Sequence, residues 1–220
     1  MKNTKQARRQ ARRKRERAKR GRRLFEFYNE VGEKYPATRI SYSGPTSKRR
    51  EKFIVGLLKK SGGLTLDVGC AEGRYKTHIE DYVGFDISLP KLEKLKGRKA
   101  WAIAEYFPFK NGIFDRVIML ELLEHTWYRK QILGECHRVL RKNGTLIMST
   151  PYGVDAFLIQ KNWSILEEYG VKFNPYVHGH FSEKYTRELL SNANFKIKLL
   201  HKVVYEEKTR FLVTMSVKNG

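Results

Sequence analysis

The chain has 220 residues, and its 45 lysines and arginines outnumber its 23 aspartates and glutamates, which gives a formal charge of +22 at pH 7. Hydrophobic residues make up 40% of the sequence, enough to bury the core of one sizeable domain that carries an appendage. No apolar run approaches the roughly 20 residues of a membrane-spanning helix, and the charged N-terminus lacks the apolar stretch of a signal peptide. The two cysteines, Cys70 and Cys136, are too few for a disulfide framework. We therefore expect a cytoplasmic protein.

About half of the excess positive charge lies in the first tenth of the chain. Residues 1–23, the basic arm, contain thirteen lysines or arginines and one acid, Glu16, for a net charge of +12. Alanines interrupt the run without forming an apolar stripe, so the arm cannot bury a face of its own. Because lysine and arginine release counterions when they contact phosphates, the arm is predicted to bind nucleic acid, either RNA or the ribosome. The alternative is a tail that only keeps the protein soluble or adheres to polyanions without a specific role.

Residues 24–45 are predicted to combine a docking segment with a linker. Aromatic side chains recur between Leu24 and Tyr35, which favours a helix that packs on the domain, and the stretch that follows has the serine, glycine and proline content of a linker. The next helix is predicted at Thr46–Lys60, because apolar residues recur at helical spacing and two glycines follow it.

Short apolar strands then alternate with helices. The predicted strands are Leu64–Val68, Val83–Asp86, Ala100–Ala104, Phe114–Leu120 and Thr145–Thr150. The predicted helices are Tyr75–Asp81, Pro90–Leu95, His125–Leu140 and Glu183–Asn192. This alternation implies right-handed crossovers and a parallel sheet. The last two apolar segments, Phe195–Tyr205 and Thr209–Val217, are joined by a short charged turn and are predicted to form an antiparallel hairpin.

A connection of about thirty residues, Pro151–His180, separates the fifth predicted strand from the next helix. It is rich in aromatic side chains, and connections of this length are usually functional or carry their own structure. We expect residues 151–181 to form a lid over a ligand pocket, because ligands bind beyond the carboxyl ends of parallel strands. The aromatic faces could stack on a base, or they could form the small core of a helical lid.

The run LDVGCAEG, from Leu66 to Gly73, is the most informative stretch of the sequence. It predicts a buried strand that ends in a glycine turn, where the backbone can pass close to a ligand. A second strand follows shortly afterwards and ends in a lone carboxylate, Asp86, which could accept hydrogen bonds from a ribose diol. The sequence has neither the glycine spacing of a dinucleotide site nor a phosphate-binding loop, which favours a nucleoside ligand that is neutral or cationic near the turn.

The residues from Leu64 to Val217 resemble the class I S-adenosylmethionine (SAM)-dependent methyltransferases. The resemblance rests on five motifs in order, which are TLDVGCAEGRY, GFDIS, AEYFPF, FDRVIMLELLEH and RVLRKNGTLIMSTP. It implies an α/β, Rossmann-like domain over residues 46–220, with a mostly parallel sheet, helices on both faces and the C-terminal antiparallel hairpin. It also implies an enzyme that takes its methyl group from SAM.

The resemblance places the cofactor contacts at the ends of the first four strands. The expected contacts are Asp67, Gly69, Cys70, Ala71, Gly73, Asp86, Ile87, Ala104, Glu105 and Leu120. The backbone of the glycine loop is expected to line the methionine part of SAM, with Asp67 ordering the loop and facing the amino group. Asp86 is expected to hold the ribose hydroxyls, and Ile87 to pack on the adenine.

Two positions depart from the family pattern. Ala71 stands where the family has its middle glycine, and Ile103 stands where an acid often precedes Ala104. Adenine recognition is therefore expected to fall either to backbone groups of Ala104 and Glu105 or to the Glu105 side chain.

The segment ELLEH after the fourth strand is the candidate for acceptor chemistry. On one helical turn, Glu121, Glu124 and His125 would share a face. Together with His180 they resemble the metal site of small-RNA 3′-terminal 2′-O-methyltransferases, and ubiquinone-pathway O-methyltransferases are similar at the same segment. A divalent metal there would lower the pKa of a hydroxyl and aim it at the methyl group. The alternative is a site without metal, in which His125 acts as a general base beside Glu121 or only packs at the start of a helix.

These observations leave three functions open. The first is a SAM-dependent methyltransferase that acts on RNA at an oxygen, with the basic arm on the phosphate backbone. The second is a methyltransferase for a small or lipid-like acceptor, whose arm is only a tether to polyanions. The third is a non-catalytic binding module with the same fold, which the intact loop and Asp86 argue against. The sequence alone does not identify the methyl acceptor.

Overall fold

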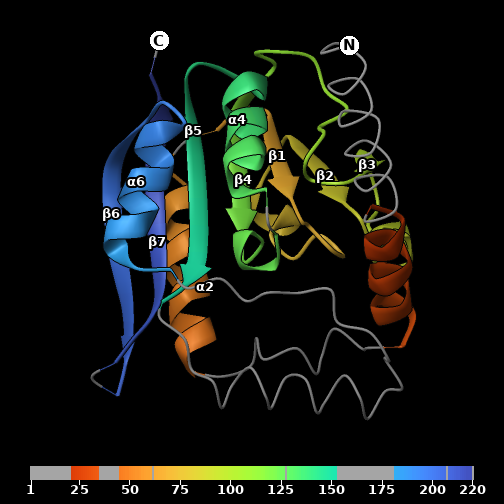
Figure 1. Cartoon of the computed structure of the whole chain (residues 1–220), viewed down its shortest axis with the longest axis horizontal. Helices are drawn as coiled ribbons and strands as arrows, with labels where there is room; N and C mark the ends of the chain where they lie inside the picture. Colours follow the sequence, from red (N-terminus) through yellow and green to blue (C-terminus); the bar gives the residue numbers. More distant parts are fainter. Residues whose placement is uncertain are drawn as a thin grey trace, which may run out of the picture.

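Seven strands form one sheet in the order β3-β2-β1-β4-β5-β7-β6 in the computed structural model, which describes residues 21–34, 45–60, 62–126, 128–152, 181–206 and 208–219 (Figure 1). The strands are β1 (Thr65–Val68), β2 (Tyr82–Asp86), β3 (Lys99–Trp101), β4 (Phe114–Leu120), β5 (Leu140–Pro151), β6 (Phe195–Tyr205) and β7 (Lys208–Lys218). Strands β1 to β5 are parallel to one another, and β7 is antiparallel to both β5 and β6. The predicted fold class, a mostly parallel sheet with a terminal antiparallel hairpin, is confirmed.

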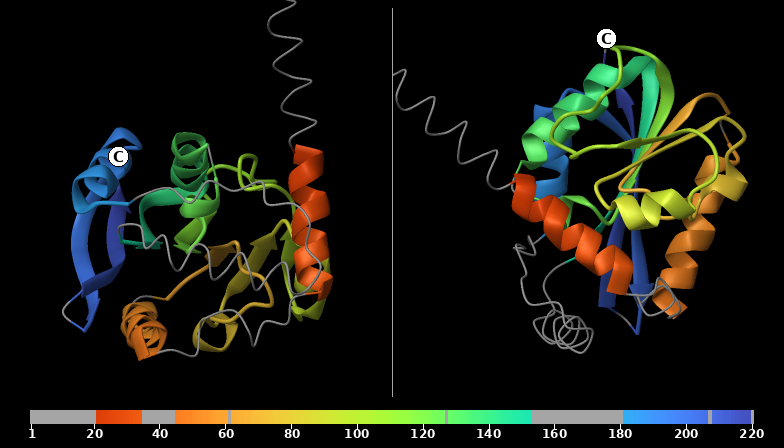
Figure 2. Two further views of the ribbon diagram at one scale, coloured as in Figure 1. Left: turned by 60° about the horizontal axis from the view of Figure 1, so that its bottom comes forward. Right: turned by 90° about the vertical axis from the view of Figure 1, so that its right-hand side faces the viewer.

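Helices cover both faces of this sheet. They are α2 (Pro45–Leu58), α3 (Leu89–Lys94), α4 (Arg129–Val139) and α6 (Glu183–Asn192), with short 3-10 turns η2 (Lys76–His78) and η3 (Leu123–His125). Helices α4 and α6 lie on one face and α2 on the other, which the two turned views make clear (Figure 2). None of the helices in the described part of the chain is long and apolar enough to cross a membrane.

The core is divided between the two faces because successive strand residues point to opposite sides. In β4, Val117 and Met119 pack with the side chains of α4 and α6, whereas Ile118 packs with those of α2. All three residues are fully buried. A strand covered on both faces reads as a continuous apolar run, which is why this segment was predictable from its composition.

Two predicted helices are shorter in the structure. The segment Tyr75–Asp81 forms only the turn η2, because Tyr75 and Ile79 are both drawn into the core and Ile79 is already extended. The helix predicted at His125–Leu140 begins at Arg129, because Thr126 has an extended backbone that separates η3 from α4. The Thr126 hydroxyl then accepts a hydrogen bond from the Tyr128 N–H at 3.1 Å.

A helix at residues 21–34 packs across the β3 side of the sheet, where docking was predicted for Leu24–Tyr35 (Figure 1). Phe27 is only 4% exposed. The Ser88 hydroxyl donates to the Tyr28 carbonyl at 2.9 Å, and the Leu89 N–H donates to Asn29 Oδ1 at 2.9 Å. Both contacts lie directly after the end of β2, so the segment that follows the basic arm is fixed beside Asp86. Residues 1–20 of the arm, residues 153–180 of the predicted lid, and His180 lie outside the described residues.

Candidate cofactor site and acceptor edge

The loop after β1 has the strained backbone that its glycines suggested. Gly69 has φ of +75° and Gly73 has φ of +80°, a region that residues with side chains rarely adopt. A Cβ atom on Gly69 would lie 2.5 Å from Leu122 Cδ1, and one on Gly73 would lie 2.5 Å from Leu95 Cδ1. Both positions therefore need glycine for the backbone conformation and for the close packing. Ala71, which replaces the family's middle glycine, also has a positive φ, of 47°.

Asp86 holds this loop in place from the end of β2. Its Oδ2 accepts a hydrogen bond from the Ala71 N–H at 2.7 Å, and its Oδ1 accepts one from the Ser88 N–H at 2.7 Å. Burial raises the pKa of Asp86, and these two backbone donors oppose the rise. A carboxylate oxygen can accept more than one hydrogen bond, so both oxygens could also receive the hydroxyls of a ribose. The carboxylate thus lies beside the glycine loop, and its expected contact with the ribose stays a prediction.

Asp67 lies below the loop, within β1, and is 3% exposed. The Tyr82 hydroxyl donates to its Oδ2 at 2.8 Å. Burial raises the pKa of Asp67 to about 7, and the negative charge of Asp86 adds to the rise. A cation such as the SAM amino group would favour the ionised form. The expected contact with that group stays a prediction, and Tyr82 is a partner that the sequence did not identify.

The adenine end is bounded by the residues that follow β2 and β3. Ile87 is half-buried, and its carbonyl accepts a hydrogen bond from Trp101 Nε1 at 2.8 Å. The Glu105 carbonyl accepts from Gln131 Nε2 at 2.7 Å, and its carboxylate accepts from the Thr126 hydroxyl at 3.4 Å. These bonds tie Glu105 to the segment that leads into α4. Trp101 in turn meets the Phe25 ring edge-on at 5.2 Å, so the helix at residues 21–34 forms part of this wall.

The acceptor edge begins at Glu121, directly after β4. Glu121 has φ of +57°, and η3 starts only at Leu123, so Glu121, Glu124 and His125 do not share a single α-helical turn. The Glu121 Oε2 lies 2.8 Å from Arg50 Nη1, and its Oε1 accepts from the Ser149 hydroxyl at 2.8 Å. Leu120, the last residue of β4, is half-buried beside it.

Arg50 is the functional residue that the sequence analysis missed. It comes from α2, is 3% exposed, and places its guanidinium 4.4 Å from the centre of the Phe211 ring. A signal was present in the sequence, because Arg50 falls on the same helical face as the buried Ile54 and Leu57. A charged residue in an apolar stripe generally has a buried partner.

Glu124 and His125 complete the edge. Glu124 is 3% exposed, and its Oε2 has no hydrogen-bond partner among the residues that the structure describes. Burial raises the pKa of Glu124 well above its ordinary value, and the neighbouring Glu121 adds to this effect. This burial favours the protonated form of Glu124 more strongly than exposure to water would. His125 Nε2 lies 3.9 Å from Glu124 Oε1, and the side chain of His125 is 34% exposed.

The chemistry of this edge does not fit a divalent metal. No group of three His, Cys, Asp or Glu side chains that could hold a metal is present in the described parts of the chain, and His180 lies outside them. Arg50 supplies the positive charge beside Glu121. Glu121, Glu124 and His125 thus do not form a metal site by themselves, and the predicted set that includes His180 stays a prediction.

Comparison with known proteins agrees with this geometry. Residues 66–148 match a protein-family model described as "Methyltransferase domain". An uncharacterised protein of Methanocaldococcus jannaschii is 31% identical over 143 residues, which are 63% of this chain and 56% of that protein. The malonyl-[acyl-carrier protein] O-methyltransferase of Legionella pneumophila is 28% identical over 138 residues, which are 56% of this chain and 48% of that enzyme. The chain thus spans about half the length of these curated relatives.

A solved structure shows the same fold over nearly the whole chain. The 1,6-didemethyltoxoflavin-N1-methyltransferase of Burkholderia thailandensis, with bound 1,6-didemethyltoxoflavin and S-adenosylhomocysteine, has a TM-score of 0.65. The match covers 90% of this chain and 88% of that enzyme at 16% identity. With the glycine loop, Asp86 and the sheet order, these findings show that residues 66–148 match a methyltransferase domain and that the chain has the fold of the class I SAM-dependent methyltransferases.

Proposed function

We propose that this protein transfers the methyl group of SAM to RNA, at an oxygen atom. The observation that carries the proposal is the position, beside Asp86, of the helix that follows the basic arm in sequence. The helix at residues 21–34 begins where the arm ends, and Ser88 and Leu89, next to Asp86, hydrogen-bond to it. A polyanion bound by the arm would therefore be held at the edge of the sheet where the ligands of this fold bind.

Methyl transfer to a hydroxyl is an in-line displacement. The bond from the methyl carbon to the sulfonium sulfur breaks, the electron pair stays on sulfur, and a new carbon–oxygen bond forms as the hydroxyl proton leaves. The acceptor oxygen must be held about 3 Å from the methyl carbon. His125 is the group at the acceptor edge that could take this proton, since its side chain is 34% exposed, whereas Glu124 is buried and Glu121 is paired with Arg50.

A small-molecule acceptor is the second candidate. The relatives named above include enzymes for a malonyl-[acyl-carrier protein] and for 1,6-didemethyltoxoflavin. Under this alternative the arm serves only as a tether to polyanions, and the charge near the crevice has no part in recognising the acceptor.

Labelled methyl transfer separates the two candidates. The purified full chain is incubated with methyl-labelled SAM and a cell extract, which is then divided into RNA, protein, lipid and small-molecule pools. We expect the label in the RNA pool and, for a ribose oxygen, in nucleotides that resist alkaline hydrolysis. Asp86→Asn should lose transfer, whereas Asp81→Asn, at an exposed carboxylate that pairs with Arg98, should retain it. Label confined to the lipid, protein or small-molecule pools would overturn the proposal.

A further inference from the structure

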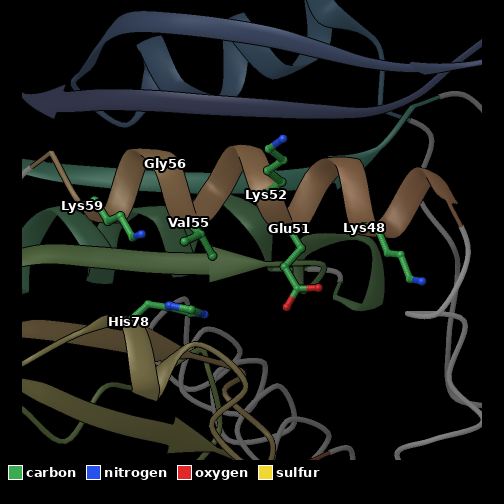
Figure 3. A pocket seen from close by; sticks show the side chains of 7 residues that line it. All are labelled: Lys48, Glu51, Lys52, Val55, Gly56, Lys59 and His78. Carbon is green, nitrogen blue, oxygen red and sulfur yellow. The ribbon is translucent and has the colours of Figure 1, made fainter.

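Helix α2 presents a lysine-rich face to an open groove of about 480 Å³ (Figure 3). Lys48 and Lys52 of α2 and Lys59, directly after the helix, line it, and their spacing of four and seven residues is close to one and two helical turns. Lys48 and Lys59 point toward the side where His78 of η2 lies, whereas Lys52 points away from it. Val55 forms an apolar patch between them.

The charge of this α2 groove is almost purely positive. None of the described residues forms an ion pair with Lys48, Lys52 or Lys59. The one acid in the lining, Glu51, is held by Arg74 through two bonds, Nη2 to Oε2 at 2.6 Å and Nε to Oε1 at 3.2 Å. Because the Glu51–Arg74 pair has no net charge, the positive charges of the three lysines in the groove are not compensated. Such a surface favours an anionic partner.

Gly56 is the second observation that points to a ligand. It lies on the same face in the interior of α2 and is exposed, and a Cβ atom there would meet nothing within 4 Å. Glycine in a helix interior destabilises the helix relative to alanine, and here the internal packing does not require it. A missing side chain between lysines lets a partner's backbone approach α2 closely. Across the groove, the ring of His78 provides a flat face of the kind on which bases stack.

The groove leads toward the acceptor edge. Lys48 is two residues from Arg50, whose guanidinium reaches Glu121, and Arg74 follows the glycine loop directly. Lys48 and Lys59 lie eleven residues apart in sequence, or about 16 Å along the helix axis. A length of this order spans several phosphates of one nucleic-acid strand.

From this arrangement we propose that the α2 groove binds the sugar–phosphate backbone of single-stranded RNA beside the nucleotide that is methylated. The inference rests on the proposed function and extends it, because it places a second contact surface on the folded domain, apart from the basic arm. The lysines neutralise consecutive phosphates, the backbone crosses α2 at Gly56, and His78 stacks on a base.

The test compares two triple variants of the full chain that change the net charge equally. One is Lys48→Gln/Lys52→Gln/Lys59→Gln, and the other is Lys110→Gln/Lys142→Gln/Lys184→Gln, at exposed lysines outside the groove. Binding of a labelled single-stranded RNA of about 20 nucleotides is followed by fluorescence anisotropy over a range of salt. Loss of three phosphate contacts should lower the slope of log K against log salt by about 2 and weaken binding about 50-fold at 0.15 M salt. The control variant should change both quantities far less.

A glycine variant keeps the test independent of lysine charge. Gly56→Leu fills the open space on α2, and Gly134→Leu is its matched control, at an exposed position in α4 that is equally open. We expect Gly56→Leu to weaken RNA binding at least fivefold and Gly134→Leu to leave it unchanged, with both proteins folded by circular dichroism. Equal RNA binding by the groove and control variants would overturn the groove while leaving methyl transfer to RNA untouched. A groove variant that loses binding only to vesicles containing phosphatidylserine would overturn it in favour of a membrane surface.

Discussion

Replacing Arg50 by methionine should reveal the cost of an unpaired carboxylate at the acceptor edge. The side chains of Arg50 and Glu121 are 4% and 14% exposed, and their charged atoms lie 2.8 Å apart. Methionine keeps most of the apolar stem that packs against Phe211 but removes the charge. Glu121 then keeps its hydrogen bond from Ser149 and loses its cation.

The expected magnitude follows from burial. Removing one partner of a buried ion pair destabilises a protein by about 3–5 kcal/mol. Most of this cost arises because the other charge stays buried without a partner or water around it. Glu121→Gln removes that charge and keeps an amide oxygen for Ser149. The double variant Arg50→Met/Glu121→Gln should therefore recover most of the loss and unfold within about 1.5 kcal/mol of the native protein.

The pH dependence gives the sign of the effect. Burial raises the pKa of Glu121 above its ordinary value of 4.5, and Arg50 opposes this, so loss of Arg50 raises the pKa further. A carboxyl with a raised pKa in the folded state contributes its stability below the unfolded pKa and loses it as the pH rises. The free energy of unfolding of Arg50→Met should thus differ least from that of the native protein near pH 5 and most near pH 8.

Urea unfolding followed by circular dichroism at these two pH values measures all four proteins of the cycle. Arg187→Met serves as the control, because the pair of Arg187 with Glu183 is exposed, at 51% and 33%, and should contribute less than about 1 kcal/mol. The reasoning would be refuted if the double variant lost as much unfolding free energy as the two single variants together. It would also be refuted if Arg50→Met lost the same unfolding free energy at both pH values.

Three further predictions concern the cofactor side. Gly69→Ala would place its Cβ 2.5 Å from Leu122 Cδ1 at φ of +75°. The variant should lose about 1–3 kcal/mol of unfolding free energy in thermal unfolding and bind SAM more weakly in calorimetry. Gly134→Ala, the control, should gain about 0.5–1 kcal/mol of unfolding free energy. The pKa of Asp67 rises from 3.8 to about 7 in the folded state, so its contribution to the free energy of unfolding should fall by about 2–3 kcal/mol between about pH 5 and pH 8. An Asp67→Asn variant whose stability keeps this pH dependence would contradict the raised pKa of Asp67. Burial raises the pKa of the Cys70 thiol, which is 5% exposed, so Cys70 should react with iodoacetamide only as the protein unfolds, and rapid labelling of the native protein in mass spectra would show otherwise.

The sequence predicted best those elements whose apolar pattern is continuous. The bounds of β4, α6 and β6 agree with the predicted segments, because each is a mainly apolar or alternating segment or an amphipathic helix between turn residues. The turn after β1 and the acid at the end of β2 were also predictable, since both have local signatures. Asp86 lies at the end of β2 and accepts a hydrogen bond from the loop.

The failures lie where contacts between distant segments set the backbone. Glu121 adopts a left-handed conformation that a glutamate rarely takes, and the ion pair with Arg50, 71 positions earlier in the chain, holds it there. Local spacing alone suggested a helical turn, and hence a metal set with Glu124 and His125. A short turn such as η2 is equally hard to predict, because the burial of Tyr75 and Ile79 decides it rather than helix propensity.

Helix α2 links the two halves of this protein's proposed chemistry. Its inner face carries Arg50, which fixes Glu121 at the acceptor edge, and its outer face carries the lysines of the α2 groove. Because one rigid helix holds both sets, an RNA strand that lies along the groove would have a fixed position relative to the groups beside the methyl donor. The helix at residues 21–34, which follows the basic arm in sequence, is held instead by Ser88 and Leu89 beside Asp86. Two separate anchors, the groove and the arm, would orient the strand between them, which one cluster of surface charge could not do.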